Sequence, residues 1–589
     1  MINDLWYKNA IIYCLSVGAY MDANGDVIGD FQGLMRRLDY LHGLGVTAIW
    51  LMPFQVSPLR DDGYDISDYY GVDPRYGTIG DFVEFTHSAK QRGIRVLIDL
   101  VVNHRSNEHQ WFKRARRDHN SKYRDWYVWS KKKPPRADRG MVFPGVQKST
   151  WSYDDAANWY FHRFYDFQPD LNTSNPEVQA EILKIMGFWI QLGVSGFRMD
   201  AVPFVIATKG PKVRKPTEQY EILRRFREFL QWRQGDCIIL AEANVLPRTD
   251  MEYFGADGDR MHMMFNFQVN QHLFYALASA DARPLAAALK ATRTRPATAQ
   301  WGMFLRNHDE LDLGRLTKQQ RQTVFDAFGP KPEMQLYDRG IRRRLATMLN
   351  GDQRRLELAY SLLFTLPGTP VIRYGDEIGM GDNLSLLERN CARTPMQWSN
   401  EPNAGFTKSD KPLLPVISGG PYGFEQINAA IQRRHPEALL NWTERIIRMR
   451  KEVPEIGWGE FAIIPNRDSA VLIIRYDWRN NSVLFIHNLD SKPREIAFST
   501  GLIGEGAATG RLLVNLLSDD HSRTDKHGRH RLIVEGYGYR WYRVGGLDYL
   551  LRRSEVDNIS RPPQGGPKAS ANADYPETNE RDIHSLARE

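Results

Sequence analysis

The feature that most constrains the fold is a repeated alternation of short apolar segments with amphipathic ones. Helix-like stretches such as residues 30–45 and 81–93 each end in a glycine that can cap a helix. Eight buried strands with intervening helices predict a (β/α)8 barrel, or TIM barrel. A doubly wound sheet is the alternative, but no glycine-rich phosphate loop follows the first strand. The eight strand candidates are AIIYCLSV, AIWLMP, RVLIDLVVN, GFRMD, CIILAEA, MMFNF, GMFLRNH and GTPVIRYG.

Two further parts are expected around this barrel. Residues 105–170, which include KKKPPRADRG, are too many for a connecting loop, so they predict an inserted subdomain after the third strand. From residue 455 the chain reads as short strands, which predict a C-terminal all-β sandwich. The expected domains are a barrel over 1–104 and 171–454, the inserted subdomain over 105–170, the sandwich over 455–550, and a disordered tail over 551–589 that is rich in Pro and Gly.

Composition narrows the choice of partners. The net charge is only +7, and no basic run with interleaved aromatic residues is present, so we expect no nucleic-acid partner. Three scattered cysteines do not fit a disulfide framework or a zinc motif. The first residues lack the pattern of a secretion signal, and no run approaches 18 apolar residues, so we expect no membrane partner and a cytoplasmic protein. A homo-oligomer is left open.

Polar residues stand where the predicted strands end. Function in such barrels is carried by residues at the carboxyl ends of the strands. Arg198 and Asp200 in GFRMDAVP share one side of their strand, which a structural ion pair would also explain. A purely structural role does not readily explain why seven polar side chains should converge on one opening of the barrel. These residues are Asn103, His104, Arg198, Asp200, Glu242, His308 and Asp309.

The segments DLVVNH, GFRMDAVP, LAEAN and FLRNHDE resemble the four signature regions of the α-amylase superfamily of retaining glycoside hydrolases and transglucosylases. The resemblance extends over about residues 5–450, through DDGYDISDYYGVDPRYGT and LPGTPVIRYGDEIGMGDN to RTPMQW. Within the superfamily the chain is most similar to the trehalose synthases, notably in SPLRDDGYDI, QPDLN and RNHDEL. This resemblance implies a small α-glucoside substrate such as maltose or trehalose, and no organic cofactor.

The resemblance also implies the catalytic roles. Retaining cleavage needs a nucleophilic carboxylate and a carboxyl acid/base about 5–5.5 Å apart. Asp200 is implied as the nucleophile, Glu242 as the acid/base, and Asp309 as a third carboxylate that stabilises the transition state. We expect Arg198 to lower the pKa of Asp200 and keep it ionised, while Glu242 stays protonated.

Sugar-binding residues follow from the same resemblance. Asp61 and Arg393 match a pair that seals the non-reducing end of the sugar site, so a terminal glucose would fit and a long starch chain would not. The alternative is that Asp61 is only a loop acid beside Asp62. The other implied residues are His104 and His308 as hydrogen-bonding partners, Tyr64 as a stacking ring, and Gln168 near the second sugar.

A calcium-type loop is expected near the start of the chain. DANGDVIGD offers oxygen ligands at alternate positions, but Gly33 at the twelfth position excludes an EF-hand. A plain polar turn is the alternative. The expected ligands of one structural Ca²⁺ are Asp22, Asn24, Asp26, the Ile28 carbonyl and Asp30.

The chain also departs from its nearest group. A second calcium site of the family would use Asn103, Asp170 and a glutamate after the nucleophile strand, where Ala207 stands here, and Lys209 could occupy that space. The altered segment FVIATKGPK bears on the acceptor side. Isomerisation of maltose and trehalose, hydrolysis by an exo-acting α-glucosidase, and transfer by a transglucosylase therefore all stay open. A non-catalytic binding protein is disfavoured, because all three carboxylates are present.

Overall fold

The computed structural model describes residues 3–409, 412–502 and 510–545. Its centre is a closed barrel of eight strands, and every neighbouring pair is parallel. Seven of the eight predicted apolar segments contain one of these strands, and the segment GMFLRNH overlaps β12, which begins two residues earlier, so the predicted TIM barrel is confirmed. In order around the barrel they are β1 (Ile12–Leu15), β2 (Ala48–Leu51), β5 (Arg95–Leu100), β9 (Gly196–Met199), β10 (Ile238–Ala241), β11 (Met263–Phe265), β12 (Gln300–Phe304) and β16 (Thr369–Arg373).

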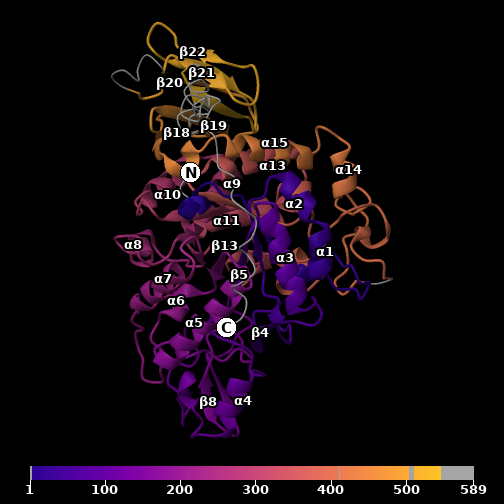
Figure 1. Ribbon diagram of the computed structural model, residues 1–589. Coiled ribbons are helices and arrows are strands. Elements are labelled where there is room, and N and C mark those ends of the chain that lie inside the picture. The colour runs from indigo at the N-terminus through magenta and orange to yellow at the C-terminus, as the bar shows by residue number, and fades with distance from the viewer. Residues whose placement is uncertain (1–2, 410–411, 503–509, 546–589) are drawn as a thin grey trace, which may run out of the picture.

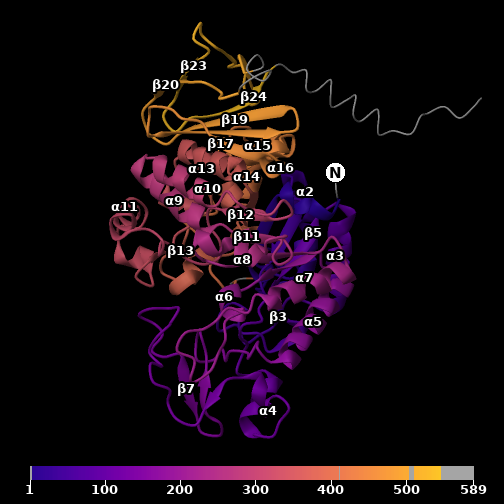
Figure 2. The same ribbon diagram turned by 90° about the vertical axis from the view of Figure 1, so that its left-hand side faces the viewer.

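Helices cover the outside of the barrel (Figures 1 and 2). The stretch predicted as one helix over 30–45 is two short helices, because Arg37 leaves helical geometry between them. Thr78 and Asp81 form a reciprocal capping box at the start of the next helix. The helices are α1 (Phe31–Arg36), α2 (Leu38–Leu44), α3 (Ile79–Gln91), α5 (Pro176–Gln191), α7 (Glu221–Arg233), α9 (Phe267–Ser279), α10 (Arg283–Ala291), α11 (Lys318–Phe328), α13 (Gln353–Thr365) and α15 (Leu439–Lys451), with shorter α6 (Val202–Val205), α8 (Asp250–Phe254), α12 (Leu345–Met348), α14 (Ala429–Arg433) and α16 (Glu455–Trp458).

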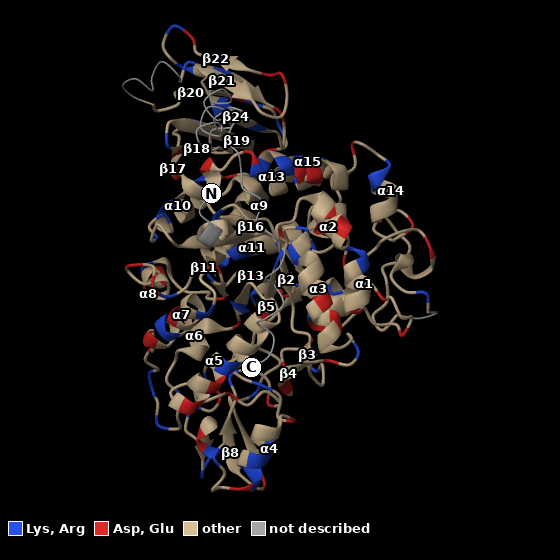
Figure 3. Ribbon diagram, in the orientation of Figure 1, with Lys and Arg blue, Asp and Glu red and all other residues tan. Residues whose placement is uncertain are grey.

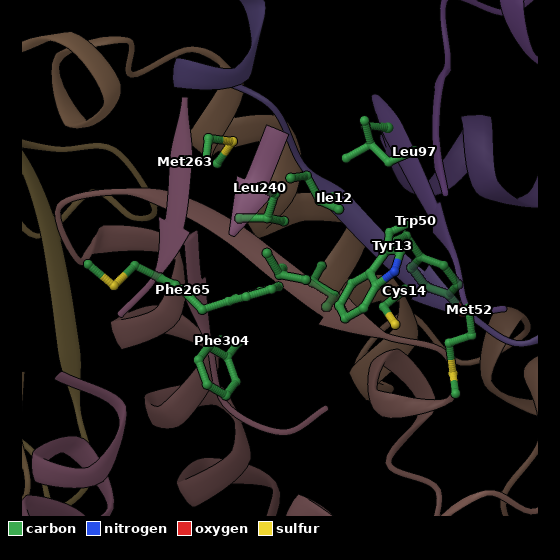
Figure 4. Packing of buried hydrophobic residues seen from close by; sticks show 14 of the residues in the cluster. Ile12, Tyr13, Cys14, Trp50, Met52, Leu97, Leu240, Met263, Phe265 and Phe304 are labelled. Atoms are coloured by element: carbon green, nitrogen blue, oxygen red, sulfur yellow. The ribbon is translucent and has the colours of Figure 1, made fainter. Parts of the chain in front are cut away.

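Side chains fill the interior of the barrel, as Figure 4 shows. Trp50 is 1% exposed, and its ring lies 5.5 Å from that of Phe265. Gly196 opens β9 where a Cβ atom would lie 2.5 Å from the Ile238 carbonyl oxygen, so only glycine fits between the two strands. This tight packing fixes the strand ends that carry the polar residues.

The chain between β5 and α5 forms a small separate unit at one end of the barrel (Figures 1 and 2). It holds α4 (Gln110–Arg117) and a three-stranded antiparallel sheet in the order β6 (Trp129–Ser130), β8 (Asn158–Phe161), β7 (Trp151–Asp154). Its own apolar cluster includes Val128, Trp151 and Phe161. The last turn of α4 is basic, as Figure 3 shows. His104 and Asp170 form an isolated bridge where the unit leaves and rejoins the barrel.

An antiparallel β domain lies at the opposite end of the barrel (Figure 1). Trp541 Nε1 donates to Ser361 Oγ of α13 at 2.8 Å, and His487 Nε2 lies 2.9 Å from the same oxygen, so the domain is fixed to the barrel. The predicted C-terminal all-β domain is confirmed. Its six-stranded sheet has the order β17 (Glu460–Ile463), β18 (Val471–Trp478), β19 (Asn481–Asn488), β24 (Tyr539–Val544), β21 (Leu512–Asn515), β22 (Ser522–Arg523), and β20 (Arg494–Phe498) pairs with β23 (His530–Val534).

Two small sheets complete the part of the chain that the structure describes. They are β3 (Gln55–Val56) with β4 (Asp68–Val72), and β13 (Leu311–Asp312), β15 (Gly340–Ile341) and β14 (Gln335–Leu336). The predicted tail, 551–589, lies outside the described residues. Within the described residues, no helix combines the length and apolar character that crossing a membrane would need.

Candidate active site

A cavity of about 360 Å³ opens at the carboxyl ends of the barrel strands. That volume falls at the small end of the range for small-molecule sites. Four of the residues predicted for the site do not line this cavity but are buried behind its wall: Gln168, Arg198, His308 and Arg393. The predicted residues that line it directly are Asp61, Tyr64, His104, Asp200, Glu242 and Asp309.

Arg198 contacts both carboxyl groups that are predicted to be catalytic, those of Asp200 and Glu242. Its Nη1 lies 2.7 Å from Asp200 Oδ1, and its Nη2 lies 2.8 Å from Glu242 Oε2. Asp99, its partner in register on β5, lies 2.5 Å from the same Nη1. The Arg198 side chain is 1% exposed, so these contacts hold the guanidinium in place. One fixed cation therefore keeps Asp200 and Glu242 close together.

Burial sets the ionisation of this pair. It raises the pKa of Asp200 to about 6, with Arg198 opposing the shift. The prediction that Arg198 lowers the pKa of Asp200 is therefore wrong in its net direction: removal from water, together with the negative charges of Asp99 and Asp309, outweighs the guanidinium. Burial likewise raises the pKa of Glu242 to about 7. Asp200 thus loses its proton at a lower pH than Glu242 does.

Asp309 has the opposite environment. Burial alone would raise the pKa of this carboxyl, but the guanidinium groups of Arg389 and Arg393 hold it well below its usual value. Arg389 Nη1 lies 2.9 Å from Asp309 Oδ1, and Arg393 Nη2 lies 3.1 Å from the same oxygen. Asp309 is therefore a permanent negative charge in the wall of the cavity.

Tyr64 and the two predicted histidines surround the base of the cavity. The Tyr64 ring stacks on His308, with centroids 5.3 Å apart, and its hydroxyl lies 2.8 Å from His308 Nε2. His104 Nε2 lies 3.1 Å from the Tyr64 carbonyl oxygen. Burial lowers the pKa of both histidines, so both are neutral at pH 7. Of the two, only His104 reaches the cavity surface.

The expected pairing of Asp61 with Arg393 needs correction. Arg393 Nη1 lies 3.3 Å from Asp62 Oδ2, whereas Asp61 Oδ2 accepts a hydrogen bond of 2.9 Å from Gln168. The reason is the left-handed backbone at Asp62 (φ 49°), which turns the chain so that Asp62 meets Arg393 and Asp61 meets Gln168. Gln168 is fully buried, so it acts on the cavity through Asp61.

A contact among three distant segments lies beside the cavity, and we call it the three-loop contact: Phe143, Tyr165, Tyr337, Glu388 and Arg389. The Tyr165 hydroxyl donates to Glu388 Oε2 at 3.1 Å and lies 3.3 Å from the Tyr337 hydroxyl. The Phe143 ring lies 4.7 Å from Tyr165 and 4.9 Å from Tyr337. The Arg389 guanidinium lies 4.9 Å from the Phe143 ring. The inserted subdomain is thereby joined to two barrel loops.

Sequence reasoning missed most of the cavity wall. Arg389 stands four residues before Arg393 in RNCARTPMQW, and that spacing was its only signal. Aromatic residues of the inserted subdomain had no signal, because they follow no barrel strand. The lining residues not assigned a site role beforehand are Val142, Phe143, Phe164, Ala201, Pro203, Phe204, Asn244, Phe267, Asn307, Glu310, Asp312, Arg339 and Arg389.

The predicted calcium ligands share one compact loop before α1. Asp22 Oδ1 accepts from the Gly25 amide at 2.7 Å, and Asp30 Oδ2 accepts from the Ala23 amide at 2.9 Å. Asp26 Oδ1 accepts from the Ile28 amide at 3.0 Å. Among the described residues no cluster of three or more His, Cys, Asp or Glu has the arrangement of a metal site, although this ligand set includes an amide and a carbonyl. The calcium ion stays a prediction.

Comparison with known proteins agrees with this geometry. A family model described as the alpha amylase catalytic domain matches residues 14–328 and 338–459, and one for the sucrose hydrolase-like C-terminal domain matches residues 481–543. A trehalose synthase of Pimelobacter sp. is 38% identical over 92% of this chain and 96% of its own. One of Thermus thermophilus is 42% identical over 95% of this chain, which spans 58% of that protein's length.

Solved structures show the same architecture. An α-amylase from H. orenii superposes with a TM-score of 0.73 at 27% identity, covering 91% of this chain and 99% of its own. A trehalulose synthase superposes with a TM-score of 0.71 at 26% identity, covering 92% of this chain and 100% of its own. The barrel, its three converging carboxyl groups and these matches lead to one conclusion: the chain belongs to the α-amylase family of enzymes.

Proposed function

We propose that this enzyme interconverts maltose and trehalose by retaining glucosyl transfer within one closed site. Its trehalose synthase relatives, at about 40% identity, support the substrate class. The position of Asp200 and Glu242 on one guanidinium supports the retaining chemistry, which needs two carboxyls close together. The single observation that carries the choice of isomerisation is the three-loop contact beside the cavity.

The first step breaks the glycosidic bond. The Asp200 carboxylate attacks the anomeric carbon, while the Glu242 carboxyl donates its proton to the leaving oxygen. A glucosyl–Asp200 ester and a free glucose result. Asp309, held ionised by Arg389 and Arg393, stabilises the positive charge that develops on the sugar ring.

The second step reverses the first with a different oxygen. The freed glucose turns within the site and presents its own anomeric hydroxyl. Glu242, now a carboxylate, removes the proton of that hydroxyl, the oxygen attacks the glucosyl carbon, and Asp200 leaves as a carboxylate. The product is the 1,1-linked disaccharide, and Glu242 is protonated again.

Retention of the free glucose decides among the three enzyme candidates. Water in place of glucose would give hydrolysis, and an outside acceptor would give transglucosylation. Phe143 and Arg389 of the three-loop contact line the cavity, and the contact ties the inserted subdomain to two barrel loops, so we infer that it slows exchange of the free glucose with solvent. It therefore favours isomerisation over the other two outcomes.

The test is to incubate the protein with maltose in the presence of excess ¹³C-labelled glucose and to follow the products by NMR. We expect trehalose that contains almost no label. Heavy labelling would indicate transfer to an outside acceptor, and glucose without trehalose would indicate an α-glucosidase. Asp200→Asn and Glu242→Gln should each lower turnover by several orders of magnitude with the fold intact, whereas normal turnover in either would exclude the mechanism.

A further inference from the structure

Lys209 lies in a cage of oxygen atoms at the root of the inserted subdomain. Its ammonium group donates to Asn103 Oδ1 at 2.7 Å and to the Leu171 carbonyl at 2.9 Å. It also lies 3.0 Å from Asp170 Oδ2 and 3.4 Å from the Asn103 carbonyl. The side chain is 3% exposed. Four oxygens therefore surround a cation that the protein itself supplies.

The cage has the chemistry of a hard-cation site. A carboxylate, an amide oxygen and backbone carbonyls are the ligands that calcium takes, usually six to eight of them. Here Asp170 is the one carboxylate among the four oxygens, and the ammonium occupies the centre. A divalent ion does not fit beside Lys209. The resemblance to the α-amylase family implies a metal in this region, and the residues present do not fit one.

The cage joins both ends of the inserted subdomain to the nucleophile side of the barrel. Asn103 precedes the subdomain, Asp170 and Leu171 lie where it rejoins the barrel, and Lys209 comes after β9 and α6. Asn103 Nδ2 lies 3.2 Å from His104 Nδ1, and His104 lines the cavity. The cation thus supports the strand end that carries His104 without touching the cavity itself.

We propose that Lys209 is a built-in cation that replaces a bound metal ion at this junction, and that the oxygen cage is a latent calcium site that opens when the ammonium is removed. Ala207 is buried two residues before Lys209, at the position where the family resemblance implies a glutamate. A carboxylate introduced at 207 would supply a second negative ligand. Lys209 is accordingly a positioning residue.

Three variants test the charge. Lys209→Met keeps most of the volume and removes the cation, and we expect a lower Tm and a loss in kcat/KM of about tenfold or more, the effect of removing an outer-shell partner. Lys209→Ala should behave alike and regain Tm when propylammonium chloride is added. Lys212→Ala is the matched control, because Lys212 is an exposed lysine of the same loop and should change nothing. A Lys209→Met protein with the Tm and kcat/KM of the unmodified enzyme would overturn the proposal.

A metal readout completes the test and does not depend on activity. The double variant Ala207→Glu with Lys209→Ala should bind one calcium per chain more than the unmodified protein after dialysis, and its Tm should fall on addition of EDTA by more than that of the unmodified protein. If Lys209→Ala alone does not fold, the double variant should fold only with calcium. No added calcium in a folded double variant would show that the cage is not a cation site.

Discussion

The hydroxyls of Tyr165 and Tyr337 lie 3.3 Å apart, although 172 residues separate them in the chain. Tyr165 belongs to the inserted subdomain, and Tyr337 belongs to a turn between two short strands, where it has a left-handed backbone (φ 57°). Left-handed geometry is unfavourable for a bulky residue, so the surrounding contacts must hold it. Glu388 and Phe143 supply those contacts.

Removing this link should change the fate of the glucosyl group. Tyr165→Phe deletes the hydrogen bonds to Glu388 and Tyr337 but keeps the ring against Phe143. A loss of about 0.5–1.5 kcal/mol, the usual net value of one hydrogen bond, should raise the ratio of glucose to trehalose released from maltose about 2- to 10-fold. Tyr153→Phe is the control, since Tyr153 is 57% exposed in the same subdomain. An unchanged ratio of glucose to trehalose in Tyr165→Phe would show that the three-loop contact does not determine which product forms.

The pH profile of activity should be bell-shaped and narrow. The active form needs ionised Asp200, with a pKa of about 6, and protonated Glu242, with a pKa of about 7. The rate constant kcat/KM should therefore rise as the pH passes about 6 and fall as it passes about 7. A pH profile of initial rates checks this, and a broad plateau from pH 5 to pH 9 would contradict the assignment.

Asp99 offers a sharper version of the pH test. Its negative charge raises the pKa of Asp200. Asp99→Asn should therefore move the acidic limb of the profile to lower pH, because the carboxylate of Asp200 would lose a like-charged neighbour. The basic limb reports Glu242 and should move less. A shift of the acidic limb to higher pH would show that Asp99 acts chiefly by orienting Arg198.

The parts of the site that sequence could predict are those attached to the barrel strands. Strand periodicity places Arg198 and Asp200 on one side of β9, and the end of β10 brings Glu242 to the same mouth. The choice between Asp61 and Asp62 was not predictable, because it depends on one left-handed residue within a loop. The net direction of the pKa shift of Asp200 is not predictable for a similar reason: the degree of burial depends on the tertiary fold, and no neighbour in sequence reports it.

The pairing of Arg393 with Asp62, in place of Asp61, can be tested by substitution. Asp62→Asn leaves the buried Arg393 guanidinium with Asp309 as its remaining carboxylate partner. We expect a loss in the free energy of unfolding of about 1–3 kcal/mol and a higher KM for maltose. Asp61→Asn should raise KM with little loss of stability, because it removes a cavity charge and keeps an oxygen for Gln168. Chemical denaturation measures the stability of each variant, and initial rates measure its KM. A large loss of stability in Asp61→Asn and a small one in Asp62→Asn would instead support the pairing of Asp61 with Arg393.

The loop from Asp22 to Asp30 should hold one calcium ion with a structural role. Asp22 accepts a hydrogen bond of 2.5 Å from the Thr407 hydroxyl, and its amide donates to the Phe406 carbonyl at 3.0 Å, so the loop is tied to a segment nearly four hundred residues away. Calcium at a hundred times its Kd would add about 2.7 kcal/mol to stability. Asp26→Ala should therefore abolish the calcium retained after dialysis and lower the Tm. Its kcat at 25 °C should stay near that of the unmodified enzyme, because Asp26 is exposed and does not line the cavity.

Asp118→Ala, at an exposed acid of the inserted subdomain, is the control for the calcium prediction and should keep both the bound metal and the Tm. Two calcium ions per chain in the unmodified protein, or unchanged metal content in Asp26→Ala, would show that the ion is bound elsewhere.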